Sequence, residues 1–358
     1  MLSRMPKRIL LVKTHAIGDT ILVTPAMRAL RRRFPAAHMA LLTGRRSAEI
    51  MEGNPDIDEI ISFDESVLFR PDSKGIIRLI FQIRRQKFET AFVFHYSGFI
   101  HLLVLAFGIP CRIGYTKDGS GFSLTHKIPW DEQDRRWTAD IHLDIARFVG
   151  AQIEDRSLTV EVPEKDREFA GRFLRQNNIE CNDILIGIFP GGGKNSRDVV
   201  SQKRWGIEKY AHVVEAVSAA YQAKIIVFGS RDDQDTVLEL SRISKLQLIN
   251  ACGKTNLKQT AALLQRCAVL ITNDSAPLHI AIAVGTPTVS VFGPSRAASL
   301  VDKDARHIII QSPIPCSPCY CNSVFPGCDK PLCMDAIGCE EVLTAVGRQM
   351  KNVLSLKE

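Results

Sequence analysis

The sequence has no apolar run long enough to cross a lipid bilayer. A membrane-spanning helix needs roughly 20 consecutive apolar residues, and every apolar stretch in these 358 residues is shorter than that. Near the start, Ile9–Val12 is followed at once by Lys13, which is typical of a short strand and not of a secretory signal peptide. We therefore expect a cytoplasmic protein.

Aromatic residues are also scarce, and two phosphate-binding signatures are missing. Phe, Trp and Tyr make up 7% of the chain, and no DNA- or RNA-binding motif occurs in it, so we expect no nucleic acid partner. The P-loop pattern GxxxxGK(S/T) is absent, and without GxGxxG a dinucleotide site is only weakly supported. Internal repeats and low-complexity segments are missing too.

The net charge of +7 is spread unevenly along the chain. Residues 1–150 hold 22 Lys and Arg against 16 Asp and Glu, whereas the remainder holds 24 against 23. Arg28, Arg31–Arg33 and Arg45–Arg46 concentrate the excess near the start. A basic first half is typical of a protein that meets an anionic lipid or membrane face. A solvated helix face is the alternative interpretation.

Strand and helix patterns alternate along the whole chain, which predicts parallel sheets with helices on both faces. A boundary at 160–163 precedes a charged helix that starts at Glu164. We therefore expect two doubly wound α/β domains, residues 1–163 and 164–339, and a C-terminal amphipathic helix over 340–358. Ligands of such sheets bind at the carboxyl ends of strands. Strands are expected at Arg8–Val12, His38–Thr43, Ile60–Phe63, Thr90–Phe94, Ile184–Phe189, Lys224–Phe228, Leu246–Asn250, Val269–Thr272 and Thr288–Phe292. The apolar spacing over Thr20–Phe34 predicts a single helix.

Residues 271–295 carry the strongest functional signal. A buried strand ends there in Asn273, Asp274 and Ser275, an N-cap cluster, and an apolar helix follows over Leu278–Val284. A helix N-terminus at the carboxyl end of a parallel strand favours anions, and Asp274 can hold hydroxyls. The segment therefore predicts a sugar-phosphate or nucleotide-sugar site. His279, one helical turn past Ser275, is either part of that site or a structural histidine.

Two further loops carry candidate residues. Gly18 and Asp19 follow the first strand, where Asp19 can cap a helix or act as a general base on a hydroxyl. A Gly-rich loop follows Phe189, and Lys203 and Arg204 precede the next helix, where they can pair with a diphosphate. A flexible surface loop is the alternative for the glycines.

Six of the ten cysteines crowd into one C-terminal segment, which the fold does not require. A structural zinc site and plain reduced thiols are equally good interpretations, and disulfides come third because a cytoplasmic location disfavours them. The six are Cys316, Cys319, Cys321, Cys328, Cys333 and Cys339.

With these residues in view, the chain resembles glycosyltransferase family 9, the lipopolysaccharide heptosyltransferases. The resemblance extends over nearly the whole chain and is carried by Gly18-Asp19, Arg112-Ile113-Gly114-Tyr115, Phe189-Pro190-Gly191, Lys203-Arg204-Trp205 and Asn273-Asp274-Ser275-Ala276-x-x-His279. It implies a GT-B fold, with acceptor on the first Rossmann-like domain and donor on the second, and a C-terminal helix that packs back across both domains. Gly206 departs from the family, which often has proline there.

The resemblance implies an inverting, metal-independent transfer of heptose from ADP-heptose to the inner core of lipopolysaccharide, with no required cofactor. It implies Asp19 as general base, Lys203 at the donor diphosphate and Asp274 at the sugar hydroxyls. The remaining donor residues would be Arg204, Gly191, Gly192, Ser275, Ala276, His279, Gly229 and Ser230, and the acceptor residues Thr14, His15 and Arg112.

The same resemblance implies a lipid A-type glycolipid acceptor and peripheral contact with the inner membrane. Two alternatives stay open from the sequence. One is a GT-B transferase or epimerase that uses a UDP-sugar, and the other is a non-catalytic protein that binds glycolipid or metal.

Overall fold

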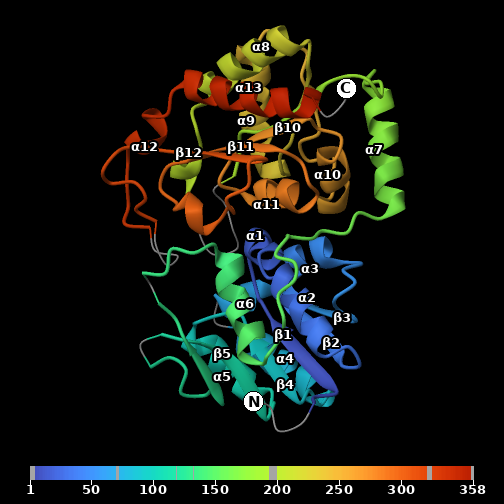
Figure 1. Cartoon of the computed structure of the whole chain (residues 1–358), viewed down its shortest axis with the longest axis vertical. Helices are drawn as coiled ribbons and strands as arrows, with labels where there is room; N and C mark the ends of the chain where they lie inside the picture. Colours follow the sequence, from blue (N-terminus) through green and yellow to red (C-terminus); the bar gives the residue numbers. More distant parts are fainter. Residues whose placement is uncertain are drawn as a thin grey trace. The chain divides into compact units, whose positions relative to one another are not determined.

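The computed structural model describes residues 5–69, 72–117, 119–131, 133–192, 200–320 and 325–355. Contacts divide the chain into two compact units, Met1–Thr159 and Val160–Glu358, a few residues from the boundary expected at 163 (Figure 1). No helix in the described ranges is both long and apolar enough to cross a membrane.

Unit 1 is a parallel sheet of six strands in the order β3-β2-β1-β4-β5-β6. Helices α4 and α5 share an apolar core with one face of this sheet, and α2 packs against α6. The strands are β1 (Arg8–Val12), β2 (His38–Gly44), β3 (Glu59–Phe63), β4 (Thr90–Val93), β5 (Cys111–Thr116) and β6 (His126–Pro129). The helices are α1 (Ile17–Ile21), α2 (Thr24–Arg33), α3 (Arg45–Met51), α4 (Ser73–Arg85), α5 (Gly98–Ala106) and α6 (Thr138–Phe148).

Unit 2 repeats the arrangement, because its parallel strands follow the order β12-β11-β10-β7-β8-β9. In both units the first and fourth strands lie side by side at the centre. The strands are β7 (Leu185–Phe189), β8 (Lys224–Val227), β9 (Ile249–Asn250), β10 (Val269–Asn273), β11 (Thr288–Phe292) and β12 (His307–Gln311). The helices are α7 (Glu164–Gln176), α8 (Ile207–Tyr221), α9 (Gln234–Ile243), α10 (Leu257–Leu264), α11 (Ala276–Ala283), α12 (Leu332–Asp335) and α13 (Cys339–Ser355).

The expected doubly wound parallel sheets are confirmed, but one helix was predicted wrongly. A single helix was expected over 20–34, whereas α1 ends at Ile21 and α2 starts afresh at Thr24. The cause is Pro25 in the first turn of α2. Proline has no N–H to donate to the preceding turn, and its ring is tolerated only where a helix begins.

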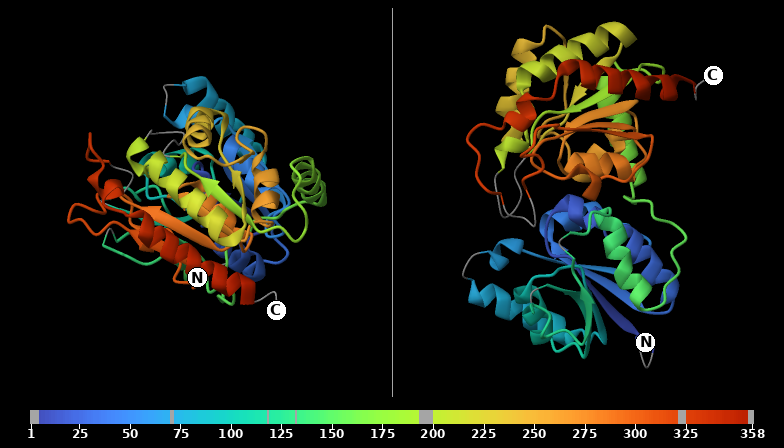
Figure 2. Two further views of the ribbon diagram at one scale, coloured as in Figure 1. Left: turned by 90° about the horizontal axis from the view of Figure 1, so that it is seen from above. Right: turned by 60° about the vertical axis from the view of Figure 1, so that its left-hand side comes forward.

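The C-terminal helix α13 packs within unit 2. It contacts α8 and the strands β10, β11 and β12, and the views of Figures 1 and 2 show it beside α8. Val342, Val346 and Met350 are its fully buried contacts. That it also reaches the first domain stays a prediction.

Ile271, at the centre of β10, should be a strong determinant of the stability of unit 2. Strand β10 lies between β7 and β11, and the Ile271 side chain is fully buried in the apolar core beside the sheet. Ile271→Ala therefore leaves a cavity and should lower the free energy of unfolding by about 2–5 kcal/mol. Leu238→Ala on α9, where the side chain is 57% exposed, should change it by less than about 0.5 kcal/mol. Urea denaturation of both variants tests this, and equal costs would contradict the assignment of Ile271 to the core.

Candidate active site

Unit 1 brings a lysine and an aspartate together at the carboxyl end of β1. Lys13 follows the last residue of this strand, and its ammonium lies 3.2 Å from the carboxylate of Asp19 at the start of α1. The Lys13 side chain is 7% exposed and that of Asp19 is 45% exposed. The buried cation therefore anchors a carboxylate that stays accessible to a ligand.

The turn between β1 and α1 is held in an unusual conformation. Ala16 has a φ of 68°, which residues other than glycine rarely adopt. Such strain persists only where the surrounding structure over-determines it, and it clusters at functional sites. Here the turn carries Gly18 and Asp19 into position beside Lys13.

Thr14 and His15 lie in this turn, against His95 from the end of the neighbouring strand β4. The Thr14 backbone N–H donates to His95 Nε2 at 2.9 Å, and the rings of His15 and His95 stack with centroids 5.2 Å apart. Burial lowers the pKa of His95 well below its usual range, and the nearby Lys13 ammonium lowers it further. His95 is therefore a neutral support for the turn.

Arg112 does not join these residues. It lies near the start of β5, in register with Ala91, which pairs with Leu10 of β1. Its guanidinium donates to the backbone carbonyls of Ile109 at 2.6 Å and Ser123 at 2.7 Å. Its observed contacts are structural, and its assignment to the acceptor stays a prediction.

Unit 2 brings a second lysine and aspartate together at the carboxyl end of β10. Lys203 Nζ lies 2.6 Å from Asp274 Oδ2, with side-chain exposures of 17% and 9%. Burial of Asp274 would raise its pKa, but Lys203, Ser295 and His279 outweigh it and hold the pKa of this carboxyl below its usual range. Lys203 also lies over the ring of Tyr320, 4.6 Å from its centroid.

Asn273 ties three segments of this site to one side chain. Its Oδ1 accepts from the Trp205 backbone N–H at 3.1 Å and from the Tyr210 hydroxyl at 3.0 Å. Its Nδ2 donates to the carbonyls of Pro190 at 3.1 Å and Gly191 at 3.0 Å. The sequence interpretation treated Asn273 as part of a helix cap, whereas it joins the Gly-rich loop to the Lys203 segment.

Asp233 organises the next corner of the site. Its carboxylate accepts from the Gly192 N–H at 3.2 Å, from the Ser230 N–H at 2.9 Å and from the Ser230 hydroxyl at 2.7 Å. Arg204 adds a bond from Nε to the Gly192 carbonyl at 2.8 Å. Gly192 has a φ of 101°, which explains why a glycine stands there.

The glycines beside Asp233 are required by close packing. A side chain at Gly191 would collide with the Asp233 carboxylate, and one at Gly229 would meet Cys252 Sγ at 2.7 Å. The loop after β7 and the turn after β8 are thus brought together with Arg204 and Ser230, as the prediction of one donor site requires.

The start of α11 completes the site. Ser275 is the N-cap, and its side chain makes no capping hydrogen bond. Pro277 in the first turn has no N–H, and the Leu278 N–H donates to the Ser275 carbonyl at 3.2 Å, so this helix start offers an anion at most the N–H groups that precede Pro277. Ala276 is the first residue of α11. His279, buried one turn later, helps to lower the pKa of Asp274, and these residues therefore share one corner with Lys203.

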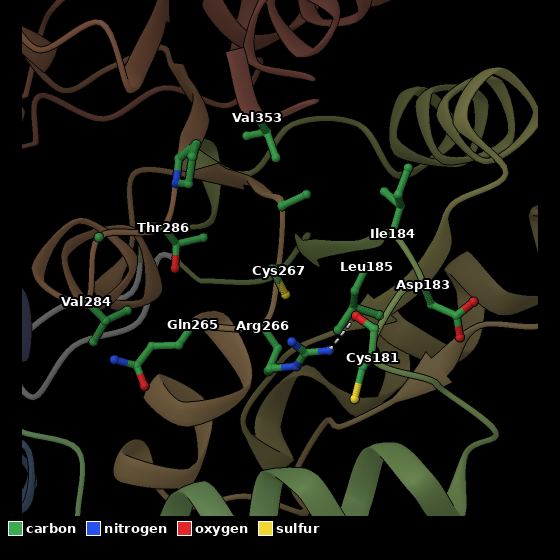
Figure 3. Close-up of a pocket in the computed structure, with 13 residues that line it drawn as sticks. Cys181, Asp183, Ile184, Leu185, Gln265, Arg266, Cys267, Val284, Thr286 and Val353 are labelled. Carbon is green, nitrogen blue, oxygen red and sulfur yellow. Dashed lines mark hydrogen bonds between the residues drawn. The ribbon is translucent and has the colours of Figure 1, made fainter. Parts of the chain in front are cut away.

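A pocket at the other edge of the same sheet is not part of this site (Figure 3). It is lined by residues that precede β7, β10 and β11, among them Asp183, Ala268 and Pro287. Arg266, which also lines it, donates to the Cys181 carbonyl at 3.3 Å. The Asp274 corner lies at the opposite, carboxyl ends of these strands.

The cysteine segment gives no support to the zinc hypothesis. Cys316, Cys319, Cys328, Cys333 and Cys339 are free thiols, and Cys321 lies outside the described residues. Burial raises the pKa of Cys333, and the nearby Cys319 and Cys316 add to this rise. No group of three or more His, Cys, Asp or Glu could hold a metal ion within the described ranges, and the zinc site stays a hypothesis.

Sequence reasoning missed Lys13, His95 and Asp233. Lys13 carried a signal, because it directly follows a buried strand and precedes the Gly18-Asp19 turn by a few residues. The sequence around His95 and Asp233 gave no clear signal that either residue belongs to a site. They become visible only when the strand order places β4 next to β1 and β8 next to β7.

The lowered pKa of Asp274 predicts a pH-dependent loss of stability in Asp274→Asn. A carboxyl whose pKa in the folded protein lies below its ordinary value of 3.8 stabilises the fold above that pH, and this contribution is lost as the pH falls through the folded pKa. Asp274→Asn should therefore lower the free energy of unfolding at neutral pH by about 1–3 kcal/mol. The gap to the wild type should close towards pH 3 or below in urea titrations, and a gap that is constant with pH would contradict the ion pair.

Most of this chain is similar to proteins of one known family. Residues 76–324 match the family model described as Glycosyltransferase family 9 (heptosyltransferase). The lipopolysaccharide core heptosyltransferase OpsX of Haemophilus influenzae is 23% identical over 303 residues, covering 82% of this chain and 80% of the relative.

Two solved structures resemble this chain over nearly its whole length. A family 9 glycosyltransferase from Veillonella parvula is 26% identical with a TM-score of 0.81, and 97% of each chain is covered. The E. coli ADP-heptose lipopolysaccharide heptosyltransferase II is 19% identical with a TM-score of 0.76, covering 98% of this chain and all of that one. The expected GT-B fold is confirmed, and the chain belongs to glycosyltransferase family 9.

Proposed function

We propose that this glycosyltransferase moves a heptose from ADP-heptose to the inner core of lipopolysaccharide with inversion at the anomeric carbon. The observation that carries the proposal is the buried Lys203–Asp274 ion pair beside the start of α11. The names of the relatives, which are lipopolysaccharide heptosyltransferases, supply the sugar and the acceptor.

Donor binding follows from the charges of unit 2. Lys203 and Arg204 supply cations for a diphosphate, and the positive end of the α11 dipole lies beside them. Asp274 accepts hydrogen bonds from sugar hydroxyls while its partner Lys203 neutralises the leaving group. Ser230 and Gly229 lie at the end of β8, where a ribose can bind.

Acceptor activation follows from the exposures of the unit 1 pair. Asp19 is the accessible member of its ion pair, whereas Lys13 is buried. Asp19 takes the proton of the acceptor hydroxyl as its oxygen bonds to the anomeric carbon. The bond from this carbon to the diphosphate breaks, and ADP leaves with the electron pair beside Lys203 and Arg204.

The proposed acceptor is a lipid A-type glycolipid, so we place the reaction at the cytoplasmic face of the inner membrane. The protein would work there as a peripheral enzyme. The first test is calorimetric binding of ADP-heptose beside a panel of UDP-sugars. Preference for ADP-heptose supports the proposal, and preference for a UDP-sugar overturns it while the family assignment stands.

Asp19→Asn should lower kcat by about 10²–10⁴-fold, because the amide cannot accept the hydroxyl proton. Donor affinity in the same calorimetric assay should be unchanged. Glu52→Gln, an exposed carboxylate after α3, is the matched control and should retain wild-type turnover. Full turnover in Asp19→Asn would remove this residue from the role of base.

Lys203→Met should lower kcat/KM by about 10²–10³-fold, because the departing diphosphate loses its nearest cation. Affinity for ADP should fall as well, since the substitution acts on the donor side. Lys245→Met, an exposed lysine before β9, is the control. If Lys203→Met bound ADP as tightly as the wild type, the diphosphate would have to bind elsewhere.

A further inference from the structure

The outer face of α4 and α5 in unit 1 carries large apolar side chains that the fold leaves in solvent. On α4, Ile77 and Phe81 are 51% and 57% exposed. On α5, Phe99, Leu102 and Leu105 are each more than 40% exposed. Ile77 and Phe81 are four residues apart, and the α5 residues recur every third position, so each set lies on one helix face.

These two faces belong to one surface. The inner residues of α4 and α5, among them Leu79 and Leu103, belong to one core cluster with the sheet, so both helices cover the same side. The Arg84 side chain of α4 lies 3.7 Å from where a Cβ of Gly108, just after α5, would stand. Figure 2 shows the two helices on that side of the sheet.

The loop after β5 extends this surface at the start of α5. His101 Nδ1 bonds the Ser120 carbonyl at 3.0 Å, which fixes the loop against the helix. Phe122 in this loop is 66% exposed, the largest exposed fraction among the large apolar side chains of the described ranges. Six such side chains, Ile77, Phe81, Phe99, Leu102, Leu105 and Phe122, thus form what we call the α4–α5 face.

The charge on this face is positive and uncompensated. Helix α4 contains Lys74, Arg78, Arg84 and Arg85 and no Asp or Glu. No carboxylate of the described ranges forms an ion pair with any of the four, whereas Arg28, Arg31 and Arg32 of α2 pair with Asp155, Asp58 and Glu154. Three of the six arginines singled out in the sequence are thus paired with carboxylates, whereas the cations of α4 have no such partner in the described ranges.

We infer that the α4–α5 face docks on the surface of an anionic lipid bilayer. An apolar strip flanked by Lys and Arg is the composition of helices that lie in a membrane interface, with apolar side chains in the acyl boundary and cations on the headgroups. The inference deepens and rests on the proposed function, because a glycolipid acceptor is reached only at a membrane. Uncompensated positive charge favours an anionic bilayer over an apolar protein partner.

Vesicle flotation with the full-length protein tests the inference without donor or acceptor. Vesicles of phosphatidylethanolamine with phosphatidylglycerol should bind the protein, and phosphatidylcholine vesicles should bind it much more weakly. Arg78→Gln with Arg85→Gln should weaken binding about 25-fold, since each cation near an anionic surface contributes about 5-fold. Phe81→Ser with Leu102→Ser should weaken it at least about tenfold.

Matched controls lie on the surface of unit 2. Leu238→Ser and Arg242→Gln change an exposed leucine and an exposed arginine of α9 and should leave vesicle binding unchanged. Turnover of a water-soluble core oligosaccharide should be the same in all four variants, which separates docking from catalysis.

Two outcomes would overturn the inference. One is equal vesicle binding by the wild type and both double variants. The other is a wild-type dimer that becomes monomeric in Phe81→Ser with Leu102→Ser while vesicle binding stays the same, which would assign the face to a second copy of the chain. Failure of ADP-heptose binding would overturn the proposed function instead, and it would leave the vesicle result standing.

Discussion

The fourfold hydrogen bonding of the Asn273 amide is the constraint on which the donor-side architecture depends. A buried amide with both its oxygen and its nitrogen satisfied is rigid, because every alternative orientation leaves a polar group without a partner. Asn273 uses this rigidity to fix the Gly-rich loop, Trp205 and Tyr210 against the end of β10. Lys203 lies two residues before Trp205 and Asp274 directly follows Asn273, and their side chains meet at 2.6 Å.

Each unit has a Lys–Asp ion pair at the carboxyl end of its two central strands. The first and fourth strands are adjacent in both, and each switch point holds one Lys–Asp pair. The two pairs differ in which partner is buried more deeply. In unit 1 the lysine is buried and the carboxylate is open, whereas in unit 2 the aspartate is the more buried partner. The same two residue types therefore leave an open carboxylate in unit 1 and a more enclosed ion pair in unit 2.

Local patterns in the sequence predicted those parts of the molecule that local physics determines. Strands β10 and β11 are fully buried and mostly apolar, so the sequence pattern predicted both strands. It also predicted the polar corner at Asp274 between them. A short motif drew attention to Lys203 and Arg204, and the structure has Lys203 in contact with Asp274 and Arg204 in contact with Gly192. Pro25 shows the limit of such patterns, since a continuous apolar spacing hid a break between α1 and α2.

Pairings across long stretches of chain could not be predicted from spacing. Arg28 and Arg32 were counted as free positive charge, but their partners Asp155 and Glu154 lie more than 120 residues away. The bonds of Arg112 to backbone carbonyls of its own unit were hidden in the same way. Propensity and periodicity describe an element, whereas the partner of a charged side chain is decided by which elements the fold makes neighbours.

The contact between Gly191 and Asp233 makes two distant positions of the chain mutually dependent. The Asp233 carboxylate occupies the space that any side chain at 191 would need, and it also holds Ser230 and the Gly192 N–H. A larger residue at 191 would therefore displace Asp233 and, with it, the turn after β8. Across related sequences, a side chain at the first position should be found only together with a smaller or displaced residue at the second.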